Sequence, residues 1–322
     1  MTDIENRVVD EVEKVVKGKR DIIIKVYAAI LAGGHILLED IPGVGKTTLA
    51  TAFARTLDMK YNRVQFTPDV LPSDIMGFSM YNAKSGEFEY REGSAFCNLF
   101  LADEINRTSP KTQSALLEIM EEKHVTVDAV TRELPQPFTV MATQNPVGSS
   151  GTQMLPESQL DRFMVRLSMG YPSHEAAVQI LKGQEFVPMD SVERIVTRDE
   201  LIGLQDKART LSVHDSIFDY IVTLVEATRE SELFSMGASP RGANALLRMS
   251  RAMAVLSGRE YVVPGARTGR SHRTQTAWAG QTQLDLRQEL FIWTAKSANT
   301  ELCKQQFLCC RKCSSGAAKI AI

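Results

Sequence analysis

The segment that most constrains this chain is 36–48, ILLEDIPGVGKTT, where an apolar run is followed by a glycine-rich turn and then by Gly45, Lys46 and Thr47. This order of strand, turn and helix start directs successive backbone N–H groups and a helix N-terminus at one anion. The strict phosphate-loop pattern expects glycine at position 40, where this chain has Asp40. The segment still predicts a loop that binds a nucleotide triphosphate, with an ordinary glycine turn as the alternative.

The residue types of this loop match the chemistry of phosphate binding. Gly43 and Gly45 allow the backbone to approach the phosphates closely. The ammonium of Lys46 can reach the β and γ phosphates, and the hydroxyl of Thr47 can bind magnesium. We therefore expect ATP and Mg²⁺ as ligands. The residues assigned to nucleotide binding are Pro42, Gly43, Val44, Gly45, Lys46, Thr47 and Thr48.

A second motif follows about fifty residues later. Residues 99–102 are apolar and are followed directly by Asp103 and Glu104. This pattern predicts a buried strand whose end presents Asp103 to a phosphate-bound magnesium ion, as the Walker-B aspartate does in P-loop NTPases. Glu104 is placed to polarise a water molecule for attack on the γ phosphate, which is a general-base role. Alone, the two acids would more simply solubilise a strand end, but their position after Lys46 and Thr47 favours the nucleotide site.

Composition and charge limit the possible functions. The 322 residues suffice for two domains, and no segment reaches the roughly 18 apolar residues of a membrane span. The N-terminal residues are acidic rather than typical of a signal peptide, so we expect a cytoplasmic protein. Residues 265–322 hold nine Lys or Arg against three Asp or Glu, although the whole chain has a net charge of −2. The rest of the chain is therefore acidic, which makes a nucleic-acid substrate unlikely.

The order of expected elements indicates an α/β fold with a parallel sheet. Strands are expected at 35–38, 61–66, 99–102 and 138–142, with helices at 3–17, 22–32, 48–57 and 111–122. Strands that alternate with helices form a parallel sheet covered on both faces, with the nucleotide at the carboxyl ends of the strands. Two insertions, near 69–92 and 123–137, are predicted to be hairpins or loops and are candidates for moving parts.

The second half of the chain has a different character. Helices are expected at 175–182, 198–210, 215–230 and 240–257 without strands between them. The predicted domains are thus an α/β nucleotide-binding domain at 1–172, a helical lid domain at 173–264 and an atypical basic tail at 265–322. The tail is interpreted as altered or out-of-frame. Its four cysteines have poor zinc-site spacing.

With these motifs in order, the chain resembles the AAA+ ATPases and, within them, the MoxR family. The resemblance rests on the following segments: LLEDIPGVGKTTLA, FTPDVLPSDIMG, GEFEYREGSAFCNLFLADEINRTSPKTQSALLEIMEE, FTVMATQNP, LPESQLDRF and GASPRG. It implies a parallel-sheet P-loop core followed by a small all-helical lid. It also implies an ATPase that acts as a chaperone-like remodeller of protein complexes, often beside von Willebrand factor A domain proteins.

The resemblance also implies roles for single residues. Asn145 matches sensor 1, where an amide can hydrogen-bond the attacking water and the γ phosphate. Arg241 matches sensor 2, the lid arginine that reaches over bound nucleotide. Gly18 matches the segment lining the adenine pocket. The alternatives are a turn-initiating asparagine before Pro146 and a surface arginine at a helix start.

One arginine is expected to act on a neighbouring subunit. Arg162 resembles the arginine finger that stabilises charge on the transferred phosphoryl group in trans, with Arg166 and Arg107 as rivals. A salt bridge from Arg162 to a nearby acid is the alternative. A finger in trans requires a homo-oligomer, expected as a ring of six. Two further functions stay open, namely a nucleic-acid-stimulated motor and a slow nucleotide-gated switch that binds a partner.

Overall fold

The computed structural model describes residues 3–39, 43–145, 155–171, 188–231 and 237–264, together with positions 174, 178 and 182. Pro42, the tail 265–322 and most of the helix expected at 175–182 lie outside these residues. Within the described part of the chain, no helix is long and apolar enough to cross a membrane.

A five-stranded sheet forms the centre of the molecule, which confirms the predicted parallel sheet with one strand more than the four expected. Its strand order is β2-β5-β8-β1-β9, and each neighbouring pair is parallel. The strands are β1 (Ile36–Glu39), β2 (Tyr61–Gln65), β5 (Leu99–Asp103), β8 (Thr139–Gln144) and β9 (Val165–Leu167). The sequence analysis missed β9, because three residues with a charged Arg166 in the middle give no apolar run.

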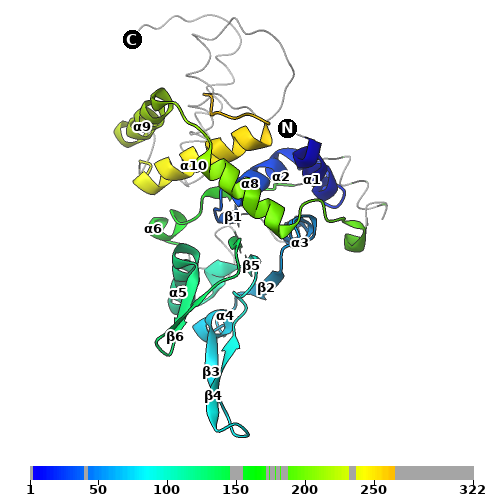
Figure 1. The fold of residues 1–322 in the computed structure, drawn as a ribbon, viewed down its shortest axis with the longest axis vertical. Helices are drawn as coiled ribbons and strands as arrows, with labels where there is room; N and C mark the ends of the chain where they lie inside the picture. The colour runs from blue at the N-terminus through cyan, green and yellow to red at the C-terminus, as the bar shows by residue number, and fades with distance from the viewer. Residues whose placement is uncertain are drawn as a thin grey trace, which may run out of the picture.

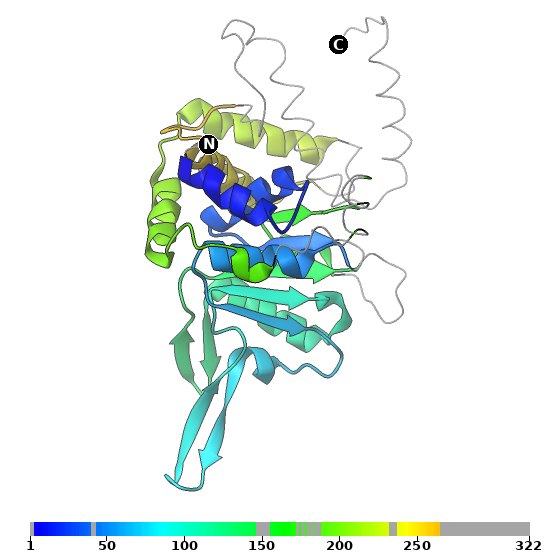
Figure 2. The same ribbon diagram turned by 90° about the vertical axis from the view of Figure 1, so that its right-hand side faces the viewer.

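Two hydrophobic cores cover the two faces of this sheet. Successive residues of a strand point to opposite faces, so Leu99 and Leu101 pack in one core, whereas Phe100 and Ala102 pack in the other. The first core is closed by α1 (Asp3–Glu13), α2 (Arg20–Leu31) and α3 (Lys46–Thr56), and the second by α5 (Pro110–Glu122). Figure 2 shows α1, α2 and α3 stacked over the sheet. This burial on both faces explains why residues 99–102 of β5 form a continuous apolar run.

Two antiparallel hairpins interrupt the alternation. The first follows the short helix α4 (Pro72–Met76) and consists of β3 (Gly77–Asn82) and β4 (Glu87–Glu92). The second consists of β6 (His124–Val127) and β7 (Val130–Glu133). Its two turn residues, Asp128 and Ala129, both have positive φ values of 53° and 60°, as the tightest hairpin turns require. Figure 1 shows both hairpins extending from the same end of the molecule.

The helical part consists of α8 (Arg198–Thr210), α9 (Asp215–Glu230) and α10 (Pro240–Leu256). Local capping defines two of these starts: Thr197 and Glu200 form a reciprocal capping box before α8, and the Ser239 hydroxyl caps α10. Helix α10 packs on α8 and on α2, which attaches the lid to the core. In Figure 1 these helices lie at the opposite end from the β3–β4 hairpin. The remaining short helices are η1 (Ile105–Arg107), α6 (Glu157–Leu160) and η2 (Met189–Ser191).

Candidate active site

The strand order opens a site at the carboxyl edge of the sheet, beside β1. After β1 the chain crosses to β2 at the far edge, and after β8 it passes over β1 to form β9 on the other side. In open parallel sheets, a reversal of strand order leaves a crevice beyond the carboxyl ends of the strands, where ligands bind. Strand β8 separates β1 from β5, so the ends of β1 and β5 lie about 10 Å apart. The glycine loop and the acidic pair therefore face the same crevice.

The glycine loop has the backbone shape that anion binding requires. Gly43 and Gly45 have φ values of 85° and 93°, and Gly45 is the N-cap of α3. The first helical hydrogen bond runs from the Leu49 N–H to the Gly45 carbonyl at 2.9 Å. The N–H groups of a first helical turn point out of the helix and attract negative charge. Lys46, the first residue of α3, is only 8 % exposed.

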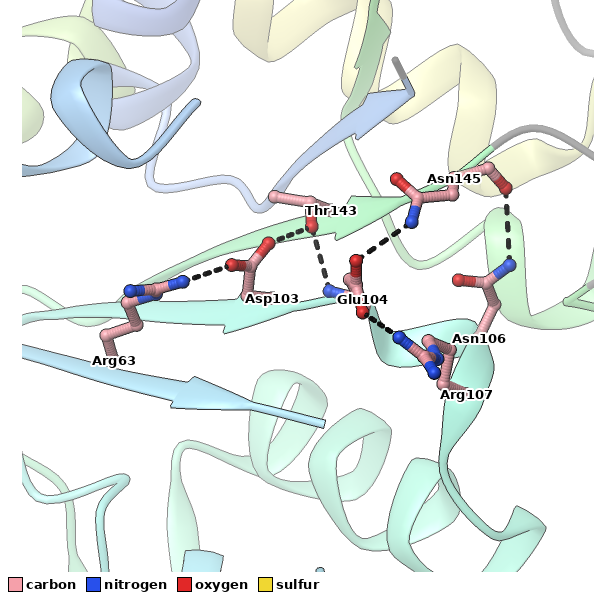
Figure 3. A network of polar contacts seen from close by, with 7 residues as sticks. All are labelled: Arg63, Asp103, Glu104, Asn106, Arg107, Thr143 and Asn145. Carbon is pink, nitrogen blue, oxygen red and sulfur yellow. Dashed lines mark hydrogen bonds and ion pairs between the residues drawn. The ribbon is translucent and has the colours of Figure 1, made fainter. Parts of the chain in front are cut away.

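Asp103 is held at the end of β5 by two donors. The Thr143 hydroxyl donates to Asp103 Oδ1 at 2.5 Å, and the Arg63 guanidinium donates to Oδ2 at 2.7 Å. Figure 3 shows this carboxylate between Thr143 of β8 and Arg63 of β2. Both carboxylate oxygens thus accept a hydrogen bond, and carboxylate oxygens are also the kind of ligand that a magnesium ion prefers.

Glu104 is the centre of a second set of contacts. Its side chain accepts from Asn145 Nδ2 at 2.9 Å and from Arg107 Nη1 at 2.8 Å. Its backbone N–H donates to the Thr143 hydroxyl at 2.8 Å, and its φ of 57° is left-handed. The structure thus brings together two residues that the sequence assigned separately, Glu104 and Asn145 (Figure 3). The backbone of Asn145 is held in turn by the Asn106 side-chain amide, which donates to the backbone carbonyl of Asn145 at 3.3 Å.

These contacts control the acidity of Glu104. Partial burial alone would raise the pKa of its carboxyl group. Hydrogen bonds from Arg107 and Asn145, the positive charge of Arg107 and a hydrogen bond from Gln65 outweigh burial and hold the pKa below the ordinary glutamate value. Glu104 is therefore ionised at neutral pH and can accept a proton.

The three arginines considered as fingers have different surroundings. Arg107 is engaged with Glu104 of its own chain. Arg166 is largely buried, and its Nε donates to Glu39 at 2.8 Å. Arg162 is ion-paired to Glu121 at 3.5 Å, and its buried Nε has no hydrogen-bond partner among the described residues. Of the three, Arg162 is partly exposed and lies outside its own chain's acidic site.

Arg241 lies with Arg162 rather than over the phosphate loop. It pairs with the same carboxylate, Glu121, at the C-terminal end of α5. Helix α5 ends at the amino edge of the sheet, because Met120 O contacts His35 Nε2 at 2.8 Å directly before β1. A four-residue strand such as β1 spans about 13 Å, which separates Glu121 from the crevice. The expectation that Arg241 reaches over the nucleotide of its own chain therefore does not match its position.

Gly18 lies on the crevice side of the molecule. It has a φ of 69° in the turn between α1 and α2. The next residue, Lys19, donates from Nζ to the carbonyl of Tyr171 at 2.8 Å, beyond the carboxyl end of β9. The place of Gly18 beside a bound nucleotide stays a prediction.

Two residues of the site were missed by the sequence analysis, Thr143 and Arg63. A threonine in an apolar strand is usually a β-forming residue, so nothing in the local pattern marked Thr143. Its only signal was its position two residues before Asn145, which places both side chains on the same face of the strand. Arg63 is adjacent to the acidic pair only because β2 pairs with β5.

The oxygen donors of the crevice fit a magnesium ion. Mg²⁺ prefers hard oxygen ligands and usually keeps several waters beside one or two carboxylates and substrate phosphates. The Asp103 carboxylate at the end of β5 and the Thr47 hydroxyl in the first turn of α3 offer such donors. Among the described residues there is no group of three or more His, Cys, Asp or Glu that could form an all-protein metal cage.

Comparisons with known proteins agree with this architecture. Residues 35–165 match the model of the "ATPase family associated with various cellular activities (AAA)", and residues 226–266 match the AAA lid domain. The chain is 51 % identical over 259 residues to the uncharacterized protein YeaC of Bacillus subtilis, a match that covers 80 % of this chain and 81 % of YeaC. It is 39 % identical over 267 residues to Chaperone MoxR1 of Mycobacterium tuberculosis, covering 80 % and 71 %.

A solved structure extends the similarity to three dimensions. The crystal structure of a Cytophaga hutchinsonii protein assigned as an ATPase is similar, with a TM-score of 0.74 and 40 % identity, covering 82 % of this chain and 84 % of that one. The two family models cover the phosphate loop with the acidic pair and then part of the lid, in that order along the chain. The chain belongs to the MoxR family of AAA+ ATPases.

Proposed function

We propose that this protein hydrolyses Mg-ATP and uses the reaction to remodel or assemble protein complexes as a chaperone-like machine. The observation that carries the proposal is the network at the carboxyl edge, in which Glu104 is held by Asn145 and Asp103 is held by Thr143. An acid that can take a proton and an acid that can ligate a cation are thereby presented beside an anion-binding loop. The similarity to Chaperone MoxR1 supports the remodelling role.

In this proposal the loop binds the triphosphate. Gly43, Gly45 and the first turn of α3 surround the phosphates, and Lys46 neutralises part of their charge. The proposed nucleotide-binding residues also include Pro42, Val44, Thr47 and Thr48, with Gly18 beside the base. Magnesium, held by Thr47 and Asp103, supplies charge neutralisation of the phosphate oxygens when bound.

Hydrolysis then follows from the position of Glu104. A water oxygen bonds to the γ phosphorus while the bond from that phosphorus to the β–γ bridging oxygen breaks, and ADP leaves. Glu104 accepts the proton of the attacking water, and the Asn145 amide orients that water. The lowered pKa of Glu104 keeps it ionised and ready for this role.

Two surface arginines are proposed to complete the site of a neighbouring subunit. Arg162 and Arg241 share Glu121 at the amino edge of the sheet, away from their own phosphate loop. Guanidinium groups at such a surface can stabilise the charge on a phosphoryl group supplied by another chain. We propose that the subunits form a ring of six, in which each chain lends both arginines to the next.

The hairpins are proposed to transmit movement to a protein client. The Arg132 guanidinium lies over the Tyr90 ring, 3.7 Å from its centroid, and so connects β7 with β4. The β3–β4 hairpin exposes Phe78, Met80, Tyr81 and Phe88, and Phe88 is 75 % exposed. Apolar side chains gathered on a projecting element mark a site of protein contact. A von Willebrand factor A domain protein is the proposed partner in the remodelling of the client.

A Glu104→Gln variant tests the function. Glutamine keeps the size of the side chain and one of its two acceptor oxygens, but it cannot accept the proton, so we expect Mg-ATP binding to persist while turnover falls by at least about a hundredfold. Calorimetry measures binding and phosphate release measures turnover. Glu118→Gln, an exposed change on α5, is the matched control. Turnover equal to wild type in Glu104→Gln would remove Glu104 from the mechanism.

The same variant separates the possible targets. A binding-competent but inactive protein should retain its client in the presence of ATP, and proteins retained by Glu104→Gln can be identified by affinity capture. Stimulation of wild-type turnover by DNA or RNA, falling steeply with salt, would instead support a nucleic-acid motor. Very slow turnover that an A-domain partner does not change would support a switch.

A further inference from the structure

We propose that Thr143 is a positioning residue for ATP hydrolysis, whose buried hydroxyl holds Asp103 and Glu104 in the arrangement that the reaction uses. This inference rests on the proposed ATPase function. Thr143 lies on β8, the strand between those that lead into the glycine loop and the acidic pair. It is fully buried, and its hydroxyl contacts both members of the pair (Figure 3).

The Thr143 hydroxyl both donates and accepts a hydrogen bond. Its single hydrogen is donated to Asp103 Oδ1 at 2.5 Å, and its oxygen accepts from the Glu104 N–H at 2.8 Å. A threonine hydroxyl has one donor and two acceptor positions, so these two contacts define its rotation. Because they involve consecutive residues, they also fix the peptide unit between the two carboxylates.

The backbone of Glu104 needs such a contact. Its φ of 57° lies in the left-handed region, which is unfavourable for a residue other than glycine. The Thr143 hydroxyl holds the backbone nitrogen in this conformation, and the Asn145 amide holds the carboxylate at 2.9 Å. Strand β8 thus controls both ends of Glu104 from one face.

The chain contains a matched control on the same strand. Thr139 is also buried on β8, but its hydroxyl has no hydrogen-bond partner among the described residues. Thr139→Val and Thr143→Val make the same chemical change on the same strand. Only the second removes hydrogen bonds to the acidic pair.

The test measures steady-state turnover and the KM for Mg-ATP in wild type, Thr143→Val, Thr143→Ser and Thr139→Val. We expect Thr143→Val to lower kcat by at least about tenfold, while its KM changes far less because the phosphate loop is untouched and Arg63 still holds Asp103. Thr143→Ser keeps the hydroxyl and should restore most of kcat. Thr139→Val should match wild type. A purely structural role of Thr143 would not separate kcat from KM in this way.

Thermal melting shows whether each variant folds. If Thr143→Val does not fold, Thr143→Ser and Thr143→Ala provide the same comparison, because they differ by the hydroxyl alone. The proposal is wrong if wild type hydrolyses ATP and Thr143→Val, or failing that Thr143→Ala, turns over as fast as Thr143→Ser. If wild type itself releases no phosphate from Mg-ATP, the proposed function fails as well, and the two failures are thereby distinguished.

Discussion

His35 should make the stability of this fold depend on pH. The ring is buried directly before β1, and its surroundings define its tautomer: the Val140 N–H donates to Nδ1 at 3.0 Å, so Nε2 carries the hydrogen and donates to the Met120 carbonyl at 2.8 Å. Burial lowers the pKa of His35 to about 4. The hydrogen bond to Met120 acts in the opposite direction, whereas the positive charges of Lys123 and Arg248 lower the pKa further. The native state therefore favours the neutral form of the His35 ring.

The sign and size of the effect follow from this shift. The pKa of the unfolded chain is about 6.5, so the contribution of His35 is fully present above that pH and is lost as the pH falls through about 4. The pKa difference between the unfolded and folded states corresponds to about 3 kcal/mol of unfolding free energy in total, of which about 2 kcal/mol is lost between pH 7.5 and pH 5. Protonation would place a second hydrogen on Nδ1, against the Val140 N–H.

Denaturant unfolding of wild type and His35→Asn at several pH values measures this contribution. The difference between their free energies of unfolding should shrink by about 2 kcal/mol from pH 7.5 to pH 5. His214→Asn is the control, because His214 is an exposed N-cap of α9 and asparagine caps helices well. If the difference between wild type and His35→Asn stays constant over this range, the ring is not held neutral by the fold.

Two further predictions concern the subunit contact and the hairpin. Arg162→Ala and Lys46→Ala should each be nearly inactive alone. Rings that mix the two variants should regain part of the turnover, because one chain supplies a working phosphate loop and the other supplies the arginine. Phosphate release from titrated mixtures measures this turnover, and mixtures that stay inactive would refute a finger in trans. Phe88→Ser should leave the melting temperature and the basal ATPase activity unchanged, since the ring is 75 % exposed. Added to a Glu104→Gln chain, it should weaken the retention of client protein in the presence of ATP. Equal retention with and without Phe88→Ser would exclude Phe88 from the client contact.

Short-range signals predicted several elements of this fold accurately. Helices α8 and α9 have the bounds expected from sequence, because caps such as Thr197 with Glu200 lie within one turn of the helix that they begin. Strand β5 and its acidic end were predictable because burial on both faces requires an uninterrupted apolar run. The general-base role of Glu104 stays a prediction that rests on its place after that run and on the order of the two phosphate motifs.

Contacts between distant segments were decided by tertiary structure alone. Val165–Leu167 is a strand only because its backbone pairs with β1, some 130 residues earlier. The convergence of Arg162 and Arg241 on Glu121 depends on how α10 packs against the core. The sequence determined which residues can bind phosphate, ligate a cation and accept a proton, because those abilities belong to side chains and their immediate neighbours. The pairing of strands decided that Thr143 and Arg63 hold Asp103, because adjacency across a sheet leaves no mark in local composition.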